Sequence, residues 1–181
     1  MRVSGVTSLS FFVKVILMSA VFVAILMGSD SDLPVMENSI EILKKLGINY
    51  EVRITSAHRT PEDTREYVLD AEQRGCVVFI AGAGMAAHLA GAVAAHTVRP
   101  VIGVPIDSGP LRGIDALLST VQMPGGIPVA SVAIGKSGAK NAAYLAAQII
   151  GVMDADLKVA LENERAANAE SIRQKNRDLL P

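Results

Sequence analysis

The chain has 181 residues, 50% of them hydrophobic, and a formal net charge of −1 at pH 7, which fits one domain with a sizeable core. Lys and Arg form no basic block, so the composition disfavours nucleic acid as a partner, because its phosphate backbone is bound by clustered cations. Cys76 is the single cysteine, which excludes an intramolecular disulfide and a cysteine-based zinc site and favours a reducing, cytoplasmic compartment.

The chain opens with an apolar stretch over residues 11–28. Such a stretch could be the core of a signal peptide or a membrane span, but Lys14 interrupts it and no small-residue cleavage site follows. We therefore expect no membrane partner and interpret 21–27 as a buried first strand. Residues 1–20 are then an N-terminal extension that need not be native, with Met18 as an alternative start.

In the rest of the first half, strand-like and helix-like segments alternate. Apolar residues at helical spacing follow the first strand and stop at Gly47, which favours a helix. Pro61 stands at the first position of the next helix, with Thr60 as its expected N-cap. The predicted elements are strands at 21–27, 50–55 and 76–82, and helices at 33–46, 61–74 and 85–96.

The same alternation continues in the second half, which predicts strands at 100–105 and 128–135 and helices at 112–122 and 139–153. We expect one catalytic α/β domain over 21–153. The segment 154–181 is polar and helical, with apolar residues too sparse to stabilise an isolated helix. We therefore interpret it as a C-terminal helical extension that packs on a neighbouring subunit.

Alternating strands and helices predict a parallel sheet with helices on both faces. Ligands of such sheets bind at the carboxyl ends of the strands. Four segments rich in Gly, Ser or Ala follow predicted strands and are the candidate ligand loops. They are GSDSD (28–32), SAHRTP (56–61), GAGMAAH (82–88) and GKSGAKN (135–141).

Four familiar kinds of site fit poorly. Residues 82–87 match a dinucleotide fingerprint but follow the third strand, and no acid ends the next strand. The sequence Gly135-Lys136-Ser137 resembles the end of a phosphate-binding P-loop, but Ala130 stands where its first glycine should be. No aromatic residues flank the loops to stack on a flavin, and the histidines lack metal-ligand spacing with carboxylates. We expect no metal and no organic cofactor.

The strongest chemical cluster is His58 with Arg59, just before a helix N-terminus. An imidazole can give and take a proton near neutral pH, and the positive helix end favours its neutral, basic form. A guanidinium offers a fork for phosphate or carboxylate. His88 could be a supporting hydrogen-bonding residue or a direct site residue. These groups suit chemistry in which the substrate itself supplies the electrons.

Five motifs resemble the class I N5-carboxyaminoimidazole ribonucleotide mutase family. They are MGSDSD, SAHRTP, AGAGMAAHLAG, VQMPGGIPVASVAIG and GAKNAAYLAAQI, in that order over about residues 21–152. The resemblance implies a three-layer α/β/α sandwich of flavodoxin-like type with a central parallel sheet, plus a C-terminal helix. It also implies a homo-octamer that interconverts N5-carboxyaminoimidazole ribonucleotide and 4-carboxy-5-aminoimidazole ribonucleotide, through retained CO2 and without metal, ATP or cofactor.

The resemblance also implies residue roles. His58 becomes the catalytic residue that removes and returns the C4 proton. The expected substrate-binding residues are Ser29, Asp32, Ser56, Arg59, Gly82 and Gly84, and the expected supporting residues are Ser31, Ala57, His88 and Met123. Asp32 either caps the following helix or accepts hydrogen bonds from ribose, and the resemblance favours ribose. Asp30 has no expected partner beyond solvent.

The chain departs from the family pattern at Met85, where Gly is common, at Ala90, where Pro is usual, at Ala116, where Ser is common, and over residues 107–112. Arg59 stands where the related class II, CO2-using carboxylases tend to carry Lys, which favours a mutase. A direct aminoimidazole ribonucleotide carboxylase and a non-catalytic nucleotide-sensing module remain alternatives. A carboxylase domain of nickel-pincer cofactor synthesis is a third, with similarity to the core only.

Overall fold

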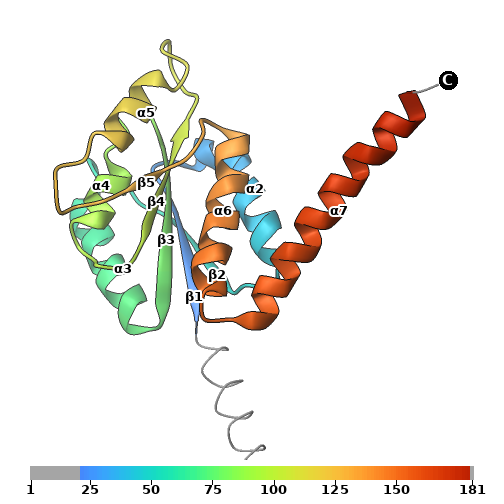
Figure 1. The fold of residues 1–181 in the computed structure, drawn as a ribbon. Helices are drawn as coiled ribbons and strands as arrows, with labels where there is room; N and C mark the ends of the chain where they lie inside the picture. The colour runs from blue at the N-terminus through green and yellow to red at the C-terminus, as the bar shows by residue number, and fades with distance from the viewer. Residues whose placement is uncertain (1–20, 180–181) are drawn as a thin grey trace, which may run out of the picture.

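The computed structural model describes residues 21–179, so the predicted N-terminal extension lies outside the described residues. The centre of the fold is a sheet of five parallel strands in the order β2-β1-β3-β4-β5 (Figure 1). This is the flavodoxin-like order, so the predicted fold class is confirmed. The strands are β1 (Phe22–Met27), β2 (Tyr50–Ile54), β3 (Cys76–Gly84), β4 (Val101–Ile106) and β5 (Ala130–Ser131).

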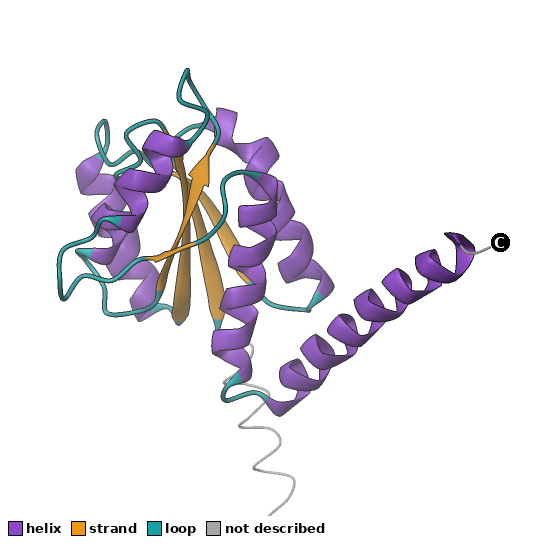
Figure 2. Cartoon of the chain, turned by 45° about the horizontal axis from the view of Figure 1, so that its top comes forward, coloured by secondary structure: helices purple, strands orange, loops and turns teal. Residues whose placement is uncertain are grey.

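Helices cover both faces of the sheet and complete the three layers (Figure 2). The layer on one face consists of α2 and α6, and the layer on the other face contains α3 and α4, with α5 beside β4 and β5. The helices are η1 (Asp30–Asp32), α2 (Leu33–Lys45), α3 (Pro61–Gln73), α4 (Leu89–Ala94), α5 (Ile114–Val121), α6 (Lys136–Gly151) and α7 (Ala155–Leu179).

Strand β1 lies at the centre of the core, and all its residues are buried. Its side chains alternate between the two faces, as the pleat requires. Val23 and Ile25 pack with α2 and α6, whereas Ala24 and Leu26 pack with α3 and α4. The continuous apolar run in the sequence therefore reflects a strand covered on both sides.

The alanine-rich segment after β3 differs from its prediction. The expected helix over 85–96 is reduced to α4, because β3 continues to Gly84 and Met85 has the left-handed backbone φ of 51°. A left-handed residue interrupts a right-handed helix. His88 consequently precedes the helix at its N-cap and does not lie within it.

The predicted strand over 128–135 is also wrong in extent, because β5 comprises two residues. The carbonyl groups of Gly103 and Pro105 on β4 accept hydrogen bonds from Val132 and Gly135, so this side of β4 faces β5. Pro105 has no N–H to donate on that side, which ends the regular ladder. The following helix α6 begins at Lys136, three positions before its predicted start.

The C-terminal helix α7 projects away from the body of the fold (Figure 1). Leu157 is its one buried residue among those described. Farther along, the Glu164 carboxylate accepts hydrogen bonds from Lys45 Nζ, at 2.7 Å, and from the Tyr144 hydroxyl. Among the described helices, none is both long and apolar enough to span a membrane.

Candidate active site

The strand register brings four loops to one edge of the sheet. Met27 on β1 pairs with Ile54 on β2 and with Gly82 on β3, and Gly84 pairs with Ile106 on β4. The segments after these strands enclose a cavity of about 430 Å³, lined by residues within 28–32, 56–59 and 83–89 and by Ser108. Three of the four predicted ligand loops, those after β1, β2 and β3, therefore meet at this cavity, at the carboxyl edge of the sheet.

The first wall is the loop after β1, which turns tightly into η1. Ser29 Oγ donates to Asp30 Oδ1 at 3.0 Å and accepts from the Ser31 backbone N–H at 3.3 Å. The same Ser31 N–H also lies 3.0 Å from Asp30 Oδ1. Asp30 is exposed, as expected, and its carboxylate in addition holds the turn in shape.

Asp32 is the buried acid of this loop, with 7% of its surface exposed. Burial raises the pKa of its carboxyl, while backbone hydrogen bonds from Ser29 and Gly28 oppose that shift. Although Asp32 occupies the N-cap of α2, its side chain makes no capping bond. The helix-cap alternative is therefore wrong, and the carboxylate is available at the cavity wall.

The second wall is the loop after β2, which folds around Ser56. Its Oγ accepts the backbone N–H groups of His58, at 3.4 Å, and Arg59, at 3.2 Å. Thr60 does not cap α3 through its side chain, contrary to expectation, because its Oγ1 instead accepts the Ser56 N–H at 3.0 Å. These bonds hold His58 and Arg59 at the cavity while leaving the Ser56 hydroxyl proton free to donate.

Arg59 links the two walls. Its Nη2 donates to the carbonyl oxygen of Gly28 at 3.1 Å, across the gap between the loops after β2 and β1. The remaining guanidinium N–H groups can still face an anion, since Arg carries five donors. The guanidinium therefore brings positive charge beside Ser29 and Ser31.

The third wall carries the second histidine. Nε2 of His58 lies 2.6 Å from Nδ1 of His88, and the rings meet edge to face with centroids 4.8 Å apart. One nitrogen must donate and the other accept, so each ring constrains the tautomer of the other. Both side chains are exposed at the cavity, where a proton can be exchanged with a ligand.

Two glycines of β3 allow close approach. A Cβ on Gly84 would stand 1.7 Å from Ser108 Oγ, so this glycine leaves room for the Ser108 side chain. A Cβ on Gly82 would stand 2.5 Å from Met36 Sδ. Gly82 is buried beneath the cavity and does not line it, whereas Gly84 does.

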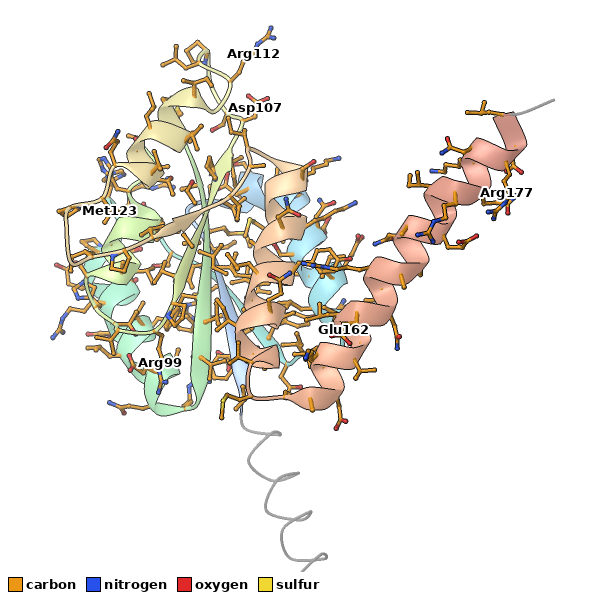
Figure 3. All side chains as sticks on the ribbon, viewed as in Figure 1. Arg99, Asp107, Arg112, Met123, Glu162 and Arg177 are labelled. Carbon is orange, nitrogen blue, oxygen red and sulfur yellow. The ribbon has the colours of Figure 1, made fainter. Side chains whose placement is uncertain are left out.

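Most of the predicted site residues come together in this cavity. Those that line it are Ser29, Ser31, Asp32, Ser56, Ala57, His58, Arg59, Gly84 and His88. Met123 does not, because its thioether lies near Gly91 on α4, where a Cβ would be 3.3 Å away. Figure 3 shows Met123 on an outer loop beside α4, apart from Asp107 at the end of β4.

The prediction that residues 135–141, after β5, form the fourth ligand loop is wrong. Residues 135–141, after β5, do not line the cavity; Gly138 instead packs so tightly on Ala133 that a Cβ would stand 1.6 Å from its carbonyl oxygen. The loop after β4 contributes Ser108 in their place. Sequence reasoning missed Ser108, which could have been found from its position two residues after the end of a buried strand, where ligand-binding residues are expected.

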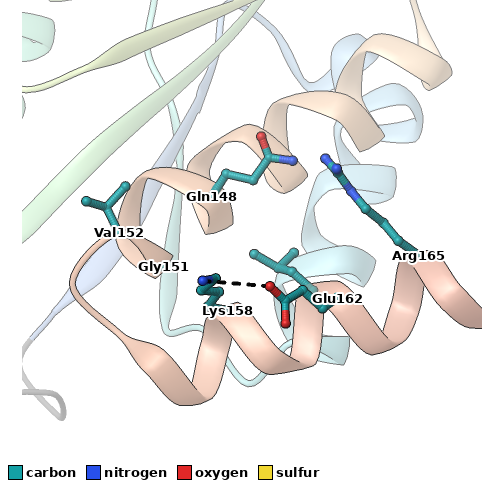
Figure 4. A pocket seen from close by; sticks show the side chains of 7 residues that line it. Gln148, Gly151, Val152, Lys158, Glu162 and Arg165 are labelled. Carbon is teal, nitrogen blue, oxygen red and sulfur yellow. Dashed lines mark ion pairs between the residues drawn. The ribbon is translucent and has the colours of Figure 1, made fainter.

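Other cavities lack this chemistry. A hollow of about 770 Å³ lies between α3, α4 and residues 126–128, and its walls pair Glu72 with Thr97 and Arg99. A second, of about 440 Å³, lies between α6 and α7 beside Lys158 and Glu162 (Figure 4). Across residues 21–179, no group of three or more His, Cys, Asp or Glu side chains is arranged to hold a metal ion.

Comparisons with known proteins identify relatives over most of the chain. The family model described as AIR carboxylase matches residues 22–171. N5-carboxyaminoimidazole ribonucleotide mutase of Pyrococcus horikoshii is 59% identical over 77% of this chain and 77% of its own. The Bacillus subtilis mutase is 49% identical over 87% of this chain and 98% of its own.

A solved structure agrees with these sequence matches. The crystal structure of Treponema denticola PurE superposes with a TM-score of 0.80 at 33% identity, covering 88% of this chain and 99% of that one. The family model spans far more than half of the chain and includes every segment that lines the cavity. This chain belongs to the AIR carboxylase family.

Proposed function

We propose that this chain is an isomerase of purine biosynthesis, which interconverts N5-carboxyaminoimidazole ribonucleotide and 4-carboxy-5-aminoimidazole ribonucleotide. The observation that carries the proposal is the 2.6 Å contact of His58 with His88 in a cavity that also presents Arg59. Relatives at 49–60% identity bear the name of this mutase.

The cavity offers matching groups for a ribose phosphate. Arg59 supplies positive charge, and the hydroxyls of Ser29 and Ser31 with the η1 backbone supply neutral donors for the phosphate. The buried Asp32 carboxylate accepts hydrogen bonds from ribose hydroxyls. Hydrogen bonds from these hydroxyls stabilise the carboxylate charge strongly, because burial has already removed the water that would otherwise solvate it.

The chemistry requires few protein groups. The bond from N5 to its carboxyl group breaks with its electron pair on N5, which takes a proton from His58, and CO2 and aminoimidazole ribonucleotide remain together in the cavity. The ring is an enamine, so C4 attacks CO2 with its own electrons, and His58 takes the C4 proton. His58 thus ends as it began, one proton has moved from C4 to N5, and the reverse direction returns it to C4. The protein holds CO2, excludes water and moves one proton; it needs no cofactor for these steps.

The competing enzyme is a carboxylase that takes CO2 directly from solution. One assay separates them: N5-carboxyaminoimidazole ribonucleotide in CO2-depleted buffer, against aminoimidazole ribonucleotide with bicarbonate. A mutase converts the first at low CO2, whereas a carboxylase forms product from the second alone. Binding of both nucleotides without turnover of either would instead indicate a nucleotide-sensing module and overturn the proposal.

We also propose a homo-octamer in the cytoplasm. The part of α7 beyond Glu164 exposes Ile172, at 58%, with no covering element among the described residues, so a neighbouring subunit is its expected support. The single, buried Cys76 suits a reducing compartment. Sedimentation should give the mass of eight chains, and truncation after Gly151 should reduce it. A truncated chain that stays octameric would contradict this role of α7.

A further inference from the structure

The loop after β4 places a hydroxyl on the cavity wall opposite Arg59. Ser108 Oγ stands over Gly84, where any Cβ would come within 1.7 Å of it. Among residues 21–179 this hydroxyl has no protein hydrogen-bond partner, while the Ser108 backbone N–H donates to Ile106 at 3.0 Å. The turn therefore holds without the hydroxyl, which is left free for a ligand.

A second contact fixes this wall. Met85 has a φ of 51° and Gly109 a φ of 75°, and a Cβ on Gly109 would lie 3.3 Å from Met85 Cγ. The loops after β3 and β4 thus touch at two successive positions, Gly84 with Ser108 and Met85 with Gly109. A left-handed conformation in a residue other than glycine persists only where its surroundings hold it. The position of Ser108 is consequently set before a ligand arrives.

The strand order determines which end of a ligand Ser108 meets. Because the sheet runs β2-β1-β3-β4, the loop with Arg59 and the loop with Ser108 stand at opposite ends of the row of loops. His58 from β2 reaches His88 after β3, between these ends. A nucleotide with its phosphate at Arg59 and its ring beside the histidines directs its ring substituent toward Ser108.

We propose that the Ser108 hydroxyl donates a hydrogen bond to the carboxylate at C4 of the imidazole ring and so distinguishes carboxylated from uncarboxylated nucleotide. The proposal rests on the proposed function and adds a specificity-determining residue to it. Arg59 is the one Lys or Arg among the described residues that line the cavity, and it is assigned to the phosphate. Neutral hydroxyls therefore remain to serve a second anionic group, and among them Ser108 stands at the β4 end of the row of loops, farthest along the sheet from the loop that carries Arg59.

The test compares two ligands in one variant. Ser108→Ala should weaken binding of 4-carboxy-5-aminoimidazole ribonucleotide about tenfold, as expected for loss of a hydrogen bond to a charged group. Binding of aminoimidazole ribonucleotide, which lacks the carboxylate, should change less than about twofold. Ser119→Ala is the matched control, because its hydroxyl bonds to Asp115 within α5. Calorimetric titration of the full chain measures both affinities.

A second variant tests the same contact from the other side. Gly84→Ala places a methyl group where the Ser108 hydroxyl stands, so it should reduce the same preference for the carboxylated nucleotide. In the double variant the two losses should be less than additive, since both remove one interaction. Ser108→Thr, which keeps a hydroxyl, should retain part of the preference.

Equal weakening of both nucleotides by Ser108→Ala, or no weakening of either, would overturn the assignment while leaving the proposed function intact. A wild-type protein that binds and converts neither nucleotide would overturn both. Turnover of N5-carboxyaminoimidazole ribonucleotide by the wild-type chain keeps these outcomes distinct.

Discussion

Nε2 of His58 and Nδ1 of His88 lie 2.6 Å apart, although 30 positions separate the two residues in the chain. They come together because the loops after β2 and β3 leave the same edge of the sheet on either side of β1. The fold thus places two groups that can each hold a proton within hydrogen-bond distance of each other. Under the proposed function His58 is the proton carrier, and we propose that His88 orients it.

Replacing His58 with Asn should lower kcat about 10²- to 10⁴-fold, the usual contribution of a positioned acid or base. Nucleotide affinity should change little, because Arg59 and Asp32 keep their positions. Steady-state kinetics with calorimetric titration measures both. His96→Asn, which alters a histidine outside this cavity, should leave kcat unchanged. A His58→Asn protein with wild-type turnover would contradict the assigned role.

Replacing His88 with Phe keeps an aromatic ring beside His58 but removes the nitrogen that it contacts. We expect kcat to fall about tenfold, the rate equivalent of a hydrogen bond worth about 1.4 kcal/mol. Nitrogen NMR of the His58 ring should show a changed tautomer population in the variant. If the tautomer population and kcat both stay the same, His88 has no orienting task.

Asp32→Asn should stabilise the ligand-free protein by roughly 0.5–1 kcal/mol at neutral pH, a usual gain when an unfavourable site residue is replaced. Burial raises the pKa of Asp32 in the folded state, so the native chain binds a proton more readily than the unfolded chain does. Its ionisation therefore lowers stability as pH rises, and the advantage of the variant should vanish in acid, where both states are protonated.

The same variant should bind the nucleotide about tenfold more weakly, because the amide loses the charged acceptor for ribose. Thermal unfolding at several pH values and a titration at neutral pH measure the two effects. A variant that is less stable than wild type at neutral pH would contradict the electrostatic reason, and one that binds normally would contradict the ribose contact.

The sequence was sufficient to predict the sheet and the edge at which the site lies. The uninterrupted apolar run of β1 and the SAHRTP segment after β2 could be recognised from neighbouring residues alone, because buried strands and strand ends have a characteristic local composition. The positive φ of Met85 leaves no such signal in this chain's own residues, since that conformation is expected of glycine; the resemblance carries the one indication, because Gly is common at this position in the family. The shortened α4 follows from it and was missed for that reason.

Contacts between residues that are far apart in the sequence but close in space account for two other errors. Met123 belongs to a motif of the family, yet its place beside Gly91 depends on how the segment after α5 crosses α4. Ser108 was overlooked because its importance comes from Gly84 on a neighbouring strand. The early end of β5 could have been predicted, because Pro105 cannot donate to an adjacent strand.

Glu164 joins α7 to the body of the fold, and Glu164→Gln should lower the free energy of unfolding by about 1 kcal/mol. Hydrogen bonds from Lys45 and Tyr144 lower the pKa of this carboxyl, so its stabilisation is present above the unfolded-state pKa. That stabilisation is lost as pH falls through the folded-state pKa, and the two proteins should then become equally stable.

Chemical denaturation at neutral and acid pH tests this, together with faster amide exchange over residues 155–164. Glu162→Gln is the matched control, because Glu162 makes an exposed contact with Lys158 at 3.8 Å (Figure 4). Equal effects of the two substitutions would show that Glu164 is no anchor.

The retention of CO2 is the central claim, and an isotope experiment tests it most directly. The enzyme would convert N5-carboxyaminoimidazole ribonucleotide labelled with ¹³C in its carboxyl group, in buffer that contains excess unlabelled bicarbonate. Mass spectrometry of the 4-carboxy-5-aminoimidazole ribonucleotide formed should find the label largely retained, because the CO2 released at N5 is captured at C4 in the same cavity. Product that carries carbon from the bicarbonate pool would contradict the account.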